Sequence, residues 1–392
     1  MSSSLIQTLK QGQLVDTTKL DDEIDALWAA KKSTAKRHRI SLPDLTDHIN
    51  PNHQHTAHIV NKLIAFDTDR GGYSYHSLKM LIHVIKRWTD FIHQRGYYAF
   101  PLSAIDGKTF DEPAQTQVFI RFMKYLVLQD YSFSTLKQYR SQVSNIYRYL
   151  GLFNPAAQSE VTAFIGGIED DFVTTTGERI QRKQAAPFMR HHLDELLAYR
   201  QNATLTPQKE WQLDKDIAIV GTAFATGLRE GEITHLRKKH IRLETKCILI
   251  KRVRSKTSKN LTDRQLLGVF LDLFKRYYDK IADSLNDEQY VFSHFSNAGK
   301  PISPDVPMDG TTVDNAFGRC YQLLLDIGYE TDMTRKWSGH SGRVGLLHYA
   351  HKMGYSDSEK QELGDWTDGR MPKLYLREYD NSVVFTKLQI VD

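Results

Sequence analysis

The chain has 392 residues, of which 40% are hydrophobic and 25% charged, and its formal net charge is +5. These values indicate a folded protein of two or three domains. The two cysteines, Cys247 and Cys320, lack the spacing of metal ligands or of a disulfide framework, which excludes a zinc site and a disulfide scaffold. The mildly basic charge suits nucleic-acid binding and equally suits many cytosolic enzymes.

Membrane insertion and secretion are not indicated either. No stretch is long and apolar enough to span a bilayer, and residues 1–6 lack the basic and apolar regions of a secretory signal. We therefore expect a cytoplasmic protein.

The N-terminal half predicts a charged extension followed by a helical domain. Residues 1–70 mix acidic and basic runs, typical of a flexible arm. Apolar residues then recur three and four positions apart, at Leu78, Leu81, Ile82, Ile85 and Trp88, which predicts a helix. Further helices are expected over 116–128, from Ser134 as N-cap, and over 159–168, so that a helical domain spans 71–171 and a linker spans 172–187.

The C-terminal half predicts a second domain over 188–380 that is mainly helical. An apolar run from Cys247 to Val253 and the segment from Arg264 to Leu266 predict a small antiparallel hairpin. Helices are expected on both sides of it, over 190–200, 214–226, 268–284, 311–327, 341–353, 358–364 and 370–377. Residues 381–392 carry an apolar stripe at Val384, Leu388 and Val391, which predicts a short terminal helix.

The chemistry lies in residues spread over this second domain. The run Trp337-Ser338-Gly339-His340-Ser341-Gly342-Arg343 is followed by Trp366 and Tyr375, and Arg229, Glu232 and Lys256 lie upstream. His340 and Arg343 are three apart and would share a helix face. The cationic and N–H groups suit one phosphodiester, and a tyrosine is a nucleophile able to attack it.

This set of residues, in this order, resembles the signature of the tyrosine recombinases. The Trp-Ser-Gly-His-Ser run is similar to the motif of the Cre-like branch of that family. The segments 75–81 and 183–188 resemble the start of the Cre-like helical domain and its interdomain linker. The resemblance extends over residues 70–392. It implies a mainly α fold, with a helical core-binding domain and a catalytic domain that contains a small antiparallel sheet, the two clamping a DNA duplex.

The resemblance assigns a role to each residue of the set. Tyr375 is the nucleophile, and Arg229 and Arg343 hold the non-bridging phosphate oxygens, since a planar guanidinium suits phosphate. His340 either donates to a phosphoryl oxygen or shuttles the tyrosine proton. Trp366 offers an N–H donor.

Two further residues support this set. Lys256 is the general acid for the departing 5′ oxygen, with Lys251, Arg254 and Lys259 nearby as competitors. Glu232 holds an active-site cation by hydrogen bonding, whereas Glu230 is expected to face elsewhere.

Each residue also has a simpler interpretation. Either arginine alone is more often a surface or salt-bridged residue, Trp366 is compatible with a core position, and Glu232 is compatible with a plain ion pair to Arg229. Tyr379, one helical turn after Tyr375, is a competing nucleophile, and the family spacing from the tryptophan favours Tyr375.

DNA-reading residues follow from the resemblance alone. Lys79 and Met80 match one helix that enters the major groove, and Gln138 lies on another, where glutamine can pair with adenine. Thr311 stands where the Cre-like pattern has an arginine, and Asp314 where it has a glutamate. These differences indicate a different target sequence.

We interpret the chain as a site-specific recombinase that exchanges DNA strands through a 3′-phosphotyrosyl intermediate, without metal or other cofactor. The expected partners are double-stranded DNA with inverted-repeat half-sites and three further copies of the chain, in a homotetramer on two duplexes at the bacterial nucleoid, associated with a phage or plasmid. A type IB topoisomerase, a telomere resolvase and a non-cleaving DNA-binding regulator are the alternatives.

Overall fold

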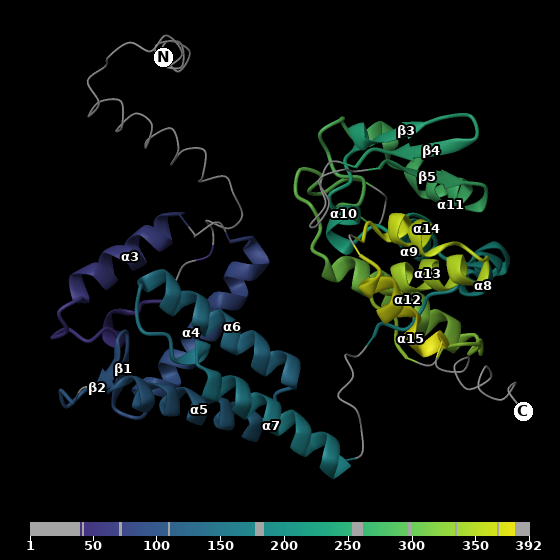
Figure 1. The fold of residues 1–392 in the computed structure, drawn as a ribbon. Coiled ribbons are helices and arrows are strands. Elements are labelled where there is room, and N and C mark those ends of the chain that lie inside the picture. The colour runs from purple at the N-terminus through teal and green to yellow at the C-terminus, as the bar shows by residue number, and fades with distance from the viewer. Residues whose placement is uncertain are drawn as a thin grey trace, which may run out of the picture. The chain divides into compact units, whose positions relative to one another are not determined.

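The structure is a computed structural model that describes residues 40, 43–69, 73–108, 110–176, 184–252, 262–296, 300–333, 335–366 and 368–380. The chain forms two compact units, Met1–Arg182 and Lys183–Asp392 (Figure 1). Both are mainly helical with small antiparallel sheets, which confirms the expected fold class. None of the helices in these ranges has the length and apolar character that crossing a membrane requires.

The first unit is a helical bundle with one two-stranded hairpin. Its elements are η2 (Thr46–His48), α3 (Thr56–Asp69), α4 (Tyr75–His93), β1 (Tyr97–Ala99), β2 (Leu102–Ala104), α5 (Glu112–Leu128), α6 (Phe133–Leu150), η4 (Pro155–Ala157) and α7 (Ser159–Thr176). The hydroxyl or carboxylate side chains of Ser74, Asp111 and Ser132 cap α4, α5 and α6. The cap of α6 is thus Ser132, two residues before the predicted Ser134, and it leaves α6 to begin at Phe133.

The core of this unit is organised around Trp88 of α4. Its ring packs edge-on against Phe119 and Phe122 of α5, with centroids 5.5 and 5.0 Å away. Its indole N–H donates to the Tyr147 hydroxyl (3.3 Å), which in turn donates to the carbonyl of Ala99 (2.6 Å). The apolar period that predicted α4 therefore buries one face of the helix and ties it to α6 and to β1.

The structure corrects two predicted boundaries. Residues 43–69, expected within the extension 1–70, belong to the bundle, because Ile59 and Phe66 of α3 are fully buried in its core. The expected linker 172–187 begins too early, since α7 continues to Thr176. Phe172 packs against Phe133 of α6 with ring centroids 5.6 Å apart, which supports helix across a threonine run that has low helix propensity. The hairpin β1–β2 was not predicted, because its strands are only three residues long.

The second unit surrounds one buried helix. Its elements are α8 (Arg190–Asn202), α9 (Pro207–Thr226), α10 (Glu230–Thr234), η5 (Lys238–His240), β3 (Ile241–Leu243), β4 (Cys247–Ile250), β5 (Arg264–Leu267), α11 (Val269–Tyr278), η6 (Ala282–Ser284), α12 (Thr311–Asp326), α13 (Ser341–Lys352), α14 (Asp357–Gly364) and α15 (Arg370–Asp380). Helix α9 is buried along most of its length and is packed by α8, α11, α12 and α13. It ends at Gly227, whose φ of 62° closes the helix as predicted.

The sheet contains the predicted hairpin and one strand more. Strands β4 and β5 pair antiparallel, and β3 adds to the free edge of β4 in the order β3-β4-β5. The helix expected over 268–284 is divided into α11 and η6, because the chain turns after Tyr278 and buries Ile281 and Leu285.

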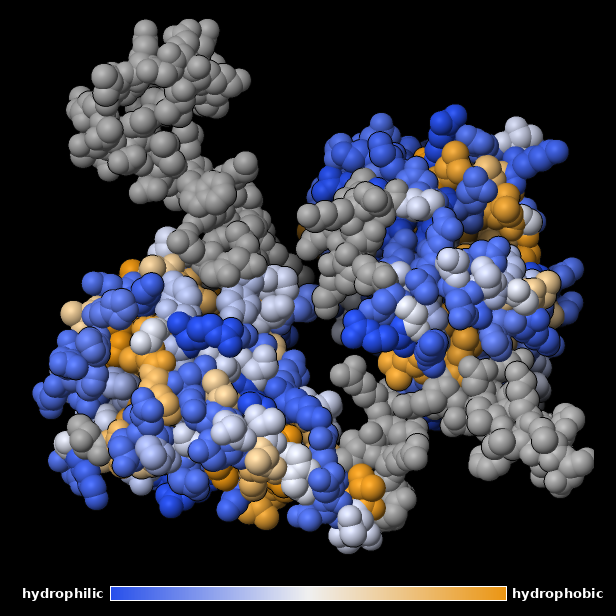
Figure 2. Space-filling view, in the orientation of Figure 1, coloured by the Kyte–Doolittle hydropathy of each residue, from blue (hydrophilic) through white to orange (hydrophobic). Residues whose placement is uncertain are grey.

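The start of the second unit is held tightly against α13. The Phe188 N–H donates to the Ser341 carbonyl (3.0 Å), and its ring packs edge-on against Trp337, 4.9 Å away. A Cβ at Gly345 would lie 1.8 Å from the Phe188 carbonyl oxygen, so only glycine allows this approach. Trp337 is thus a core residue that anchors the segment before His340. The visible surface of both units is largely hydrophilic, with scattered apolar patches (Figure 2).

Candidate active site

Arg229 lies at a sharp turn between two helices of the second unit. Helix α9 ends at Gly227, and Arg229 then forms the N-cap of α10. The Glu232 carboxylate accepts a hydrogen bond from the Arg229 backbone N–H (2.8 Å) and lies 3.9 Å from its guanidinium. Glu232 thus caps α10 and lies within ion-pair distance of Arg229, while its expected role of holding an active-site cation stays a prediction.

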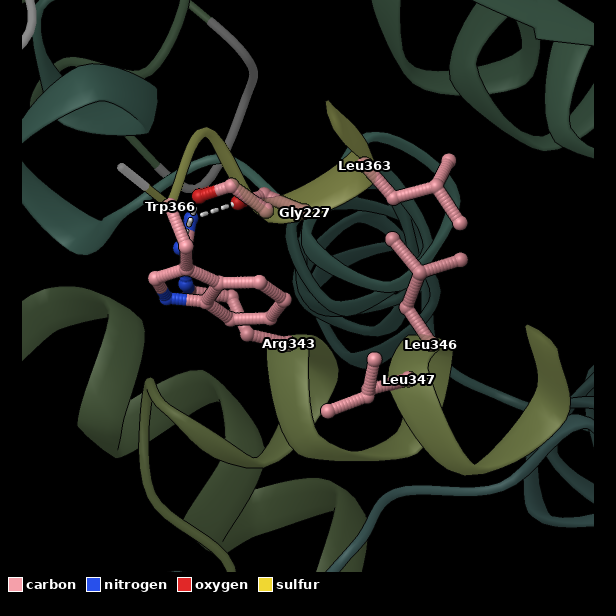
Figure 3. Close-up of a pocket in the computed structure, with 7 residues that line it drawn as sticks. Gly227, Arg343, Leu346, Leu347, Leu363 and Trp366 are labelled. Carbon is pink, nitrogen blue, oxygen red and sulfur yellow. Dashed lines mark hydrogen bonds between the residues drawn. The ribbon is translucent and has the colours of Figure 1, made fainter. Parts of the chain in front are cut away.

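Arg343 is the buried centre of the site, with 3% of its surface exposed. From α13 its guanidinium donates to the carbonyl of Gly227 and, at 2.6 Å, to the carbonyl of Gly364 (Figure 3). A guanidinium has more N–H groups than these two bonds use. One side chain therefore joins α13 to the ends of α9 and α14.

Burial and the neighbouring Arg229 lower the pKa of Arg343 to about 10, while Tyr375 acts in the opposite direction. The residue still carries its charge at neutral pH. The carbonyls that accept its hydrogen bonds are neutral, so these bonds do not cancel that charge. The site is accordingly a place where an anion gains free energy.

Trp366 and Tyr375 meet beside this arginine. The Trp366 ring centroid lies 5.2 Å from the Arg343 Cζ (Figure 3). The same ring lies 5.5 Å from the Tyr375 ring. A Cβ at Gly364 would lie 2.2 Å from the indole, so this position requires glycine. Besides the N–H donor role expected from sequence, the indole face thus packs against the guanidinium.

Helix α15 carries Tyr375 and is held at that residue's backbone. The Tyr375 carbonyl accepts hydrogen bonds from the Gln184 side chain (2.5 Å) and from the His348 Nε2 (3.0 Å). Gln184 precedes α8 and His348 lies on α13, so two separate segments set the position of the tyrosine. Sequence reasoning gave neither residue a role.

His340 lies at the N-terminal end of α13, two turns before His348. It is the N-cap residue of the helix, and its side chain is 52% exposed, whereas Arg343 is buried. His340 keeps helical backbone angles, so it stays three residues before Arg343 on α13, more exposed than the arginine. That the two side chains act on one phosphate stays a prediction. The His340 Nδ1 lies 2.9 Å from the Glu230 Oε1, so the expectation that Glu230 faces elsewhere is wrong.

A layer of charges under the site was also missed. Arg252, 2% exposed at its side chain, binds Glu232 (2.6 Å) and Asp365 (2.7 Å), and Arg264 binds Asp365 from the next strand (3.0 Å). Burial lowers the pKa of Arg264. The Asp365 backbone takes the left-handed conformation, with φ at 49°, directly before Trp366. The signal in the sequence was a pair of arginines that flank the basic turn, Arg252 just after β4 and Arg264 at the start of β5.

Lys256 lies outside the described residues, in the connection between β4 and β5. The described base of that connection is closed by the Arg252 N–H, which donates to the Asp263 carboxylate (3.1 Å). Its role as a general acid stays a prediction.

The predicted DNA-reading residues fall into two groups. In the first unit, Lys79 and Met80 of α4 and Gln138 of α6 line one groove. In the second unit, Thr311 begins α12 and is exposed. Asp314 accepts a hydrogen bond from the Gly339 N–H (2.7 Å), which gives it a positioning role beside His340 that sequence reasoning did not suggest.

Comparison with known proteins identifies a matching family and a similar sequence. Residues 190–382 match the phage integrase family. The chain is 26% identical over 321 residues to recombinase Cre of Escherichia phage P1, which corresponds to 80% of this chain and 87% of that protein.

Two solved structures share the fold at low identity. XerH site-specific recombinase bound to a palindromic difH substrate is 13% identical, with a TM-score of 0.53 and coverage of 94% of both chains. The Tn1549 transposon integrase in complex with a circular intermediate DNA is 12% identical, with a TM-score of 0.51 and coverage of 81% of this chain and 94% of that chain.

The buried charge layer predicts a large stability effect at Arg252. Arg252→Ala leaves Glu232 and Asp365 without their shared cation, so we expect the free energy of unfolding to fall by about 3–5 kcal/mol. Arg242→Ala removes a 78% exposed partner of Glu244 and is expected to change it by less than about 1 kcal/mol. Urea unfolding followed by tryptophan fluorescence measures both. Equal effects of the two changes would contradict the buried layer.

Proposed function

This chain belongs to the phage integrase family of tyrosine recombinases, and from that premise we propose that Tyr375 is the nucleophile that cleaves one DNA strand. The observation that carries the proposal is the buried Arg343, which keeps its positive charge beside Arg229, Trp366 and Tyr375. A phosphodiester placed there would meet two guanidinium groups and an aromatic nucleophile together.

The cleavage step follows from this arrangement. The Tyr375 hydroxyl oxygen attacks phosphorus, the bond from phosphorus to the 5′ oxygen breaks, and a 3′-phosphotyrosyl link and a 5′-hydroxyl form. A tyrosine hydroxyl is a weak nucleophile until its proton is removed. Its proton passes to His340, while Arg229 and Arg343 stabilise the negative charge on the phosphoryl oxygens.

In the second half of the reaction, the phosphotyrosyl bond breaks and a phosphodiester bond forms again. A 5′-hydroxyl from a partner duplex attacks the phosphotyrosyl link and displaces Tyr375, which regains its proton. The covalent link retains the energy of the broken phosphodiester, so strand exchange needs neither ATP nor a metal ion. Lys256 gives a proton to the departing 5′ oxygen in the first step and accepts one in the second.

Recognition of DNA involves both units. We propose that Lys79, Met80 and Gln138 read the major groove from the groove that they line, with Thr311 as a further reading position in the second unit. Two half-sites in inverted orientation then recruit two copies of the chain to one duplex, because a twofold site matches a twofold pair of proteins.

Strand exchange requires two such duplexes, which gives a homotetramer. Residues 381–392, whose apolar stripe follows the catalytic segment, are proposed to bind a neighbouring copy in a cyclic order. The likeness to a phage recombinase supports action at the bacterial nucleoid in association with a phage or plasmid.

Tyr375→Phe tests the nucleophile. The change removes one oxygen and little volume, so we expect loss of the covalent protein–DNA adduct on a denaturing gel and nearly unchanged binding to the site. Tyr379→Phe is the matched control and should still cleave. Adduct formation by the Tyr375 variant, together with its loss in the Tyr379 variant, would move the nucleophile by one helical turn.

A substrate with sulfur at the 5′ bridging position tests Lys256. A thiolate leaves without a proton, so this substrate should restore cleavage by Lys256→Ala. It should not restore cleavage by Arg343→Ala, because that variant lacks phosphate stabilisation. Rescue of both variants, or of neither, would contradict the general-acid role. The wild-type reaction should also proceed in EDTA.

Truncation after Asp380 tests assembly. Monomer folding and binding to a single half-site should stay unchanged, because the removed residues are proposed to contact another copy. Cooperative binding to a full site, measured by gel shift, should fall sharply together with recombination. A truncated protein that recombines at the wild-type rate, or one that unfolds, would contradict the proposed contact.

A further inference from the structure

Glu230 and His340 form a pair that joins two distant parts of the chain. The Glu230 Oε1 lies 2.9 Å from the His340 Nδ1, and the two residues are 110 positions apart. Glu230 is the first residue of α10, directly after Arg229, and its side chain is 25% exposed. The contact therefore couples the turn that carries one active-site arginine to the helix that carries the other.

Two glycines make room for the Glu230 side chain. A Cβ at Gly339 would lie 2.4 Å from its Cγ, and a Cβ at Gly310 would lie 3.2 Å from its Oε2. The Gly339 N–H is in turn held by Asp314. The Glu230 carboxylate thus packs closely against Gly339 and Gly310. The segment before His340 is itself held by the hydrogen bond to Asp314.

The chemistry of the pair determines where the histidine carries its proton. A carboxylate can only accept a hydrogen bond, so the His340 Nδ1 must donate. In the neutral imidazole the other nitrogen, Nε2, then has a lone pair and is able to take a proton. The opposite tautomer would place the two acceptors against each other.

We infer that Glu230 is a positioning residue that holds His340 with its proton on Nδ1, so that Nε2 receives the Tyr375 proton during cleavage and returns it during rejoining. The inference rests on the proposed function, because it specifies which nitrogen of His340 does the work. Glu230 acts through His340 and does not touch the phosphate.

Kinetic coupling between the two residues is the first test. Single-turnover adduct formation is measured for wild type, Glu230→Ala, His340→Ala and the double variant. A positioned general base contributes roughly 100-fold or more, and we expect Glu230→Ala to lose about tenfold of that. In the His340→Ala background the same change should have no effect, because the group through which it acts is gone. Equal losses in the two backgrounds would overturn the inference.

The tautomer of His340 is the second test and does not depend on activity. Nitrogen-15 NMR of histidine-labelled protein distinguishes Nδ1–H from Nε2–H, and the His340 signal is assigned by its loss in His340→Ala. Wild type should show Nδ1–H, whereas Glu230→Ala should gain Nε2–H. Glu230→Gln keeps the size of the side chain and offers an amide donor to Nδ1, so it should shift the ring in the same direction.

Glu288→Ala is the matched control, since Glu288 is a surface partner of Arg237 and Lys239 and should change neither measurement. Nε2–H in the wild-type protein, or Nδ1–H retained in both Glu230 variants, would overturn the inference. A wild-type protein that forms no adduct would instead overturn the proposed function. The NMR measurement would in that case still show whether Glu230 holds the His340 proton on Nδ1.

Discussion

The site depends on one buried arginine whose guanidinium donates hydrogen bonds to main-chain carbonyls. Arg343 joins the ends of α9 and α14 to α13 through the carbonyls of Gly227 and Gly364. A carboxylate in either place would satisfy the same N–H groups but would also cancel the charge. Neutral acceptors position the guanidinium and leave its positive charge available to the proposed phosphate, so the same contacts that stabilise the fold also shape the candidate site.

The carboxylates lie one layer away and serve a different purpose. Glu232 and Asp365 bind Arg252, and Arg264 adds a second cation to Asp365. This layer connects the strands that flank the Lys256 connection to the turn before Trp366. Buried ion pairs of this kind gain little net stability over apolar packing, but they are costly to break, so they favour one arrangement of the hairpin over its alternatives.

The sequence predicted the elements that are marked by local patterns of residues. It did not predict the features that depend on contacts between distant parts of the chain. The apolar period of α4 and the glycine that ends α9 are local signals, and both were predicted correctly. The short strands β1 and β3 and the burial of α3 depend on partners elsewhere in the chain. Glu230 was misjudged for the same reason, because the His340 side chain that it contacts is 110 residues away.

The two glutamates of α10 show how one short helix can serve two sides of a site. Residues two apart on a helix point in different directions. Glu232 turns toward Arg229 and Arg252, while Glu230 turns toward His340. One carboxylate thus contacts the arginines of the site, and the other contacts the imidazole that is proposed to move a proton. Because both belong to the same five-residue helix, a shift of α10 would disturb the proposed phosphate binding and the proposed proton transfer together.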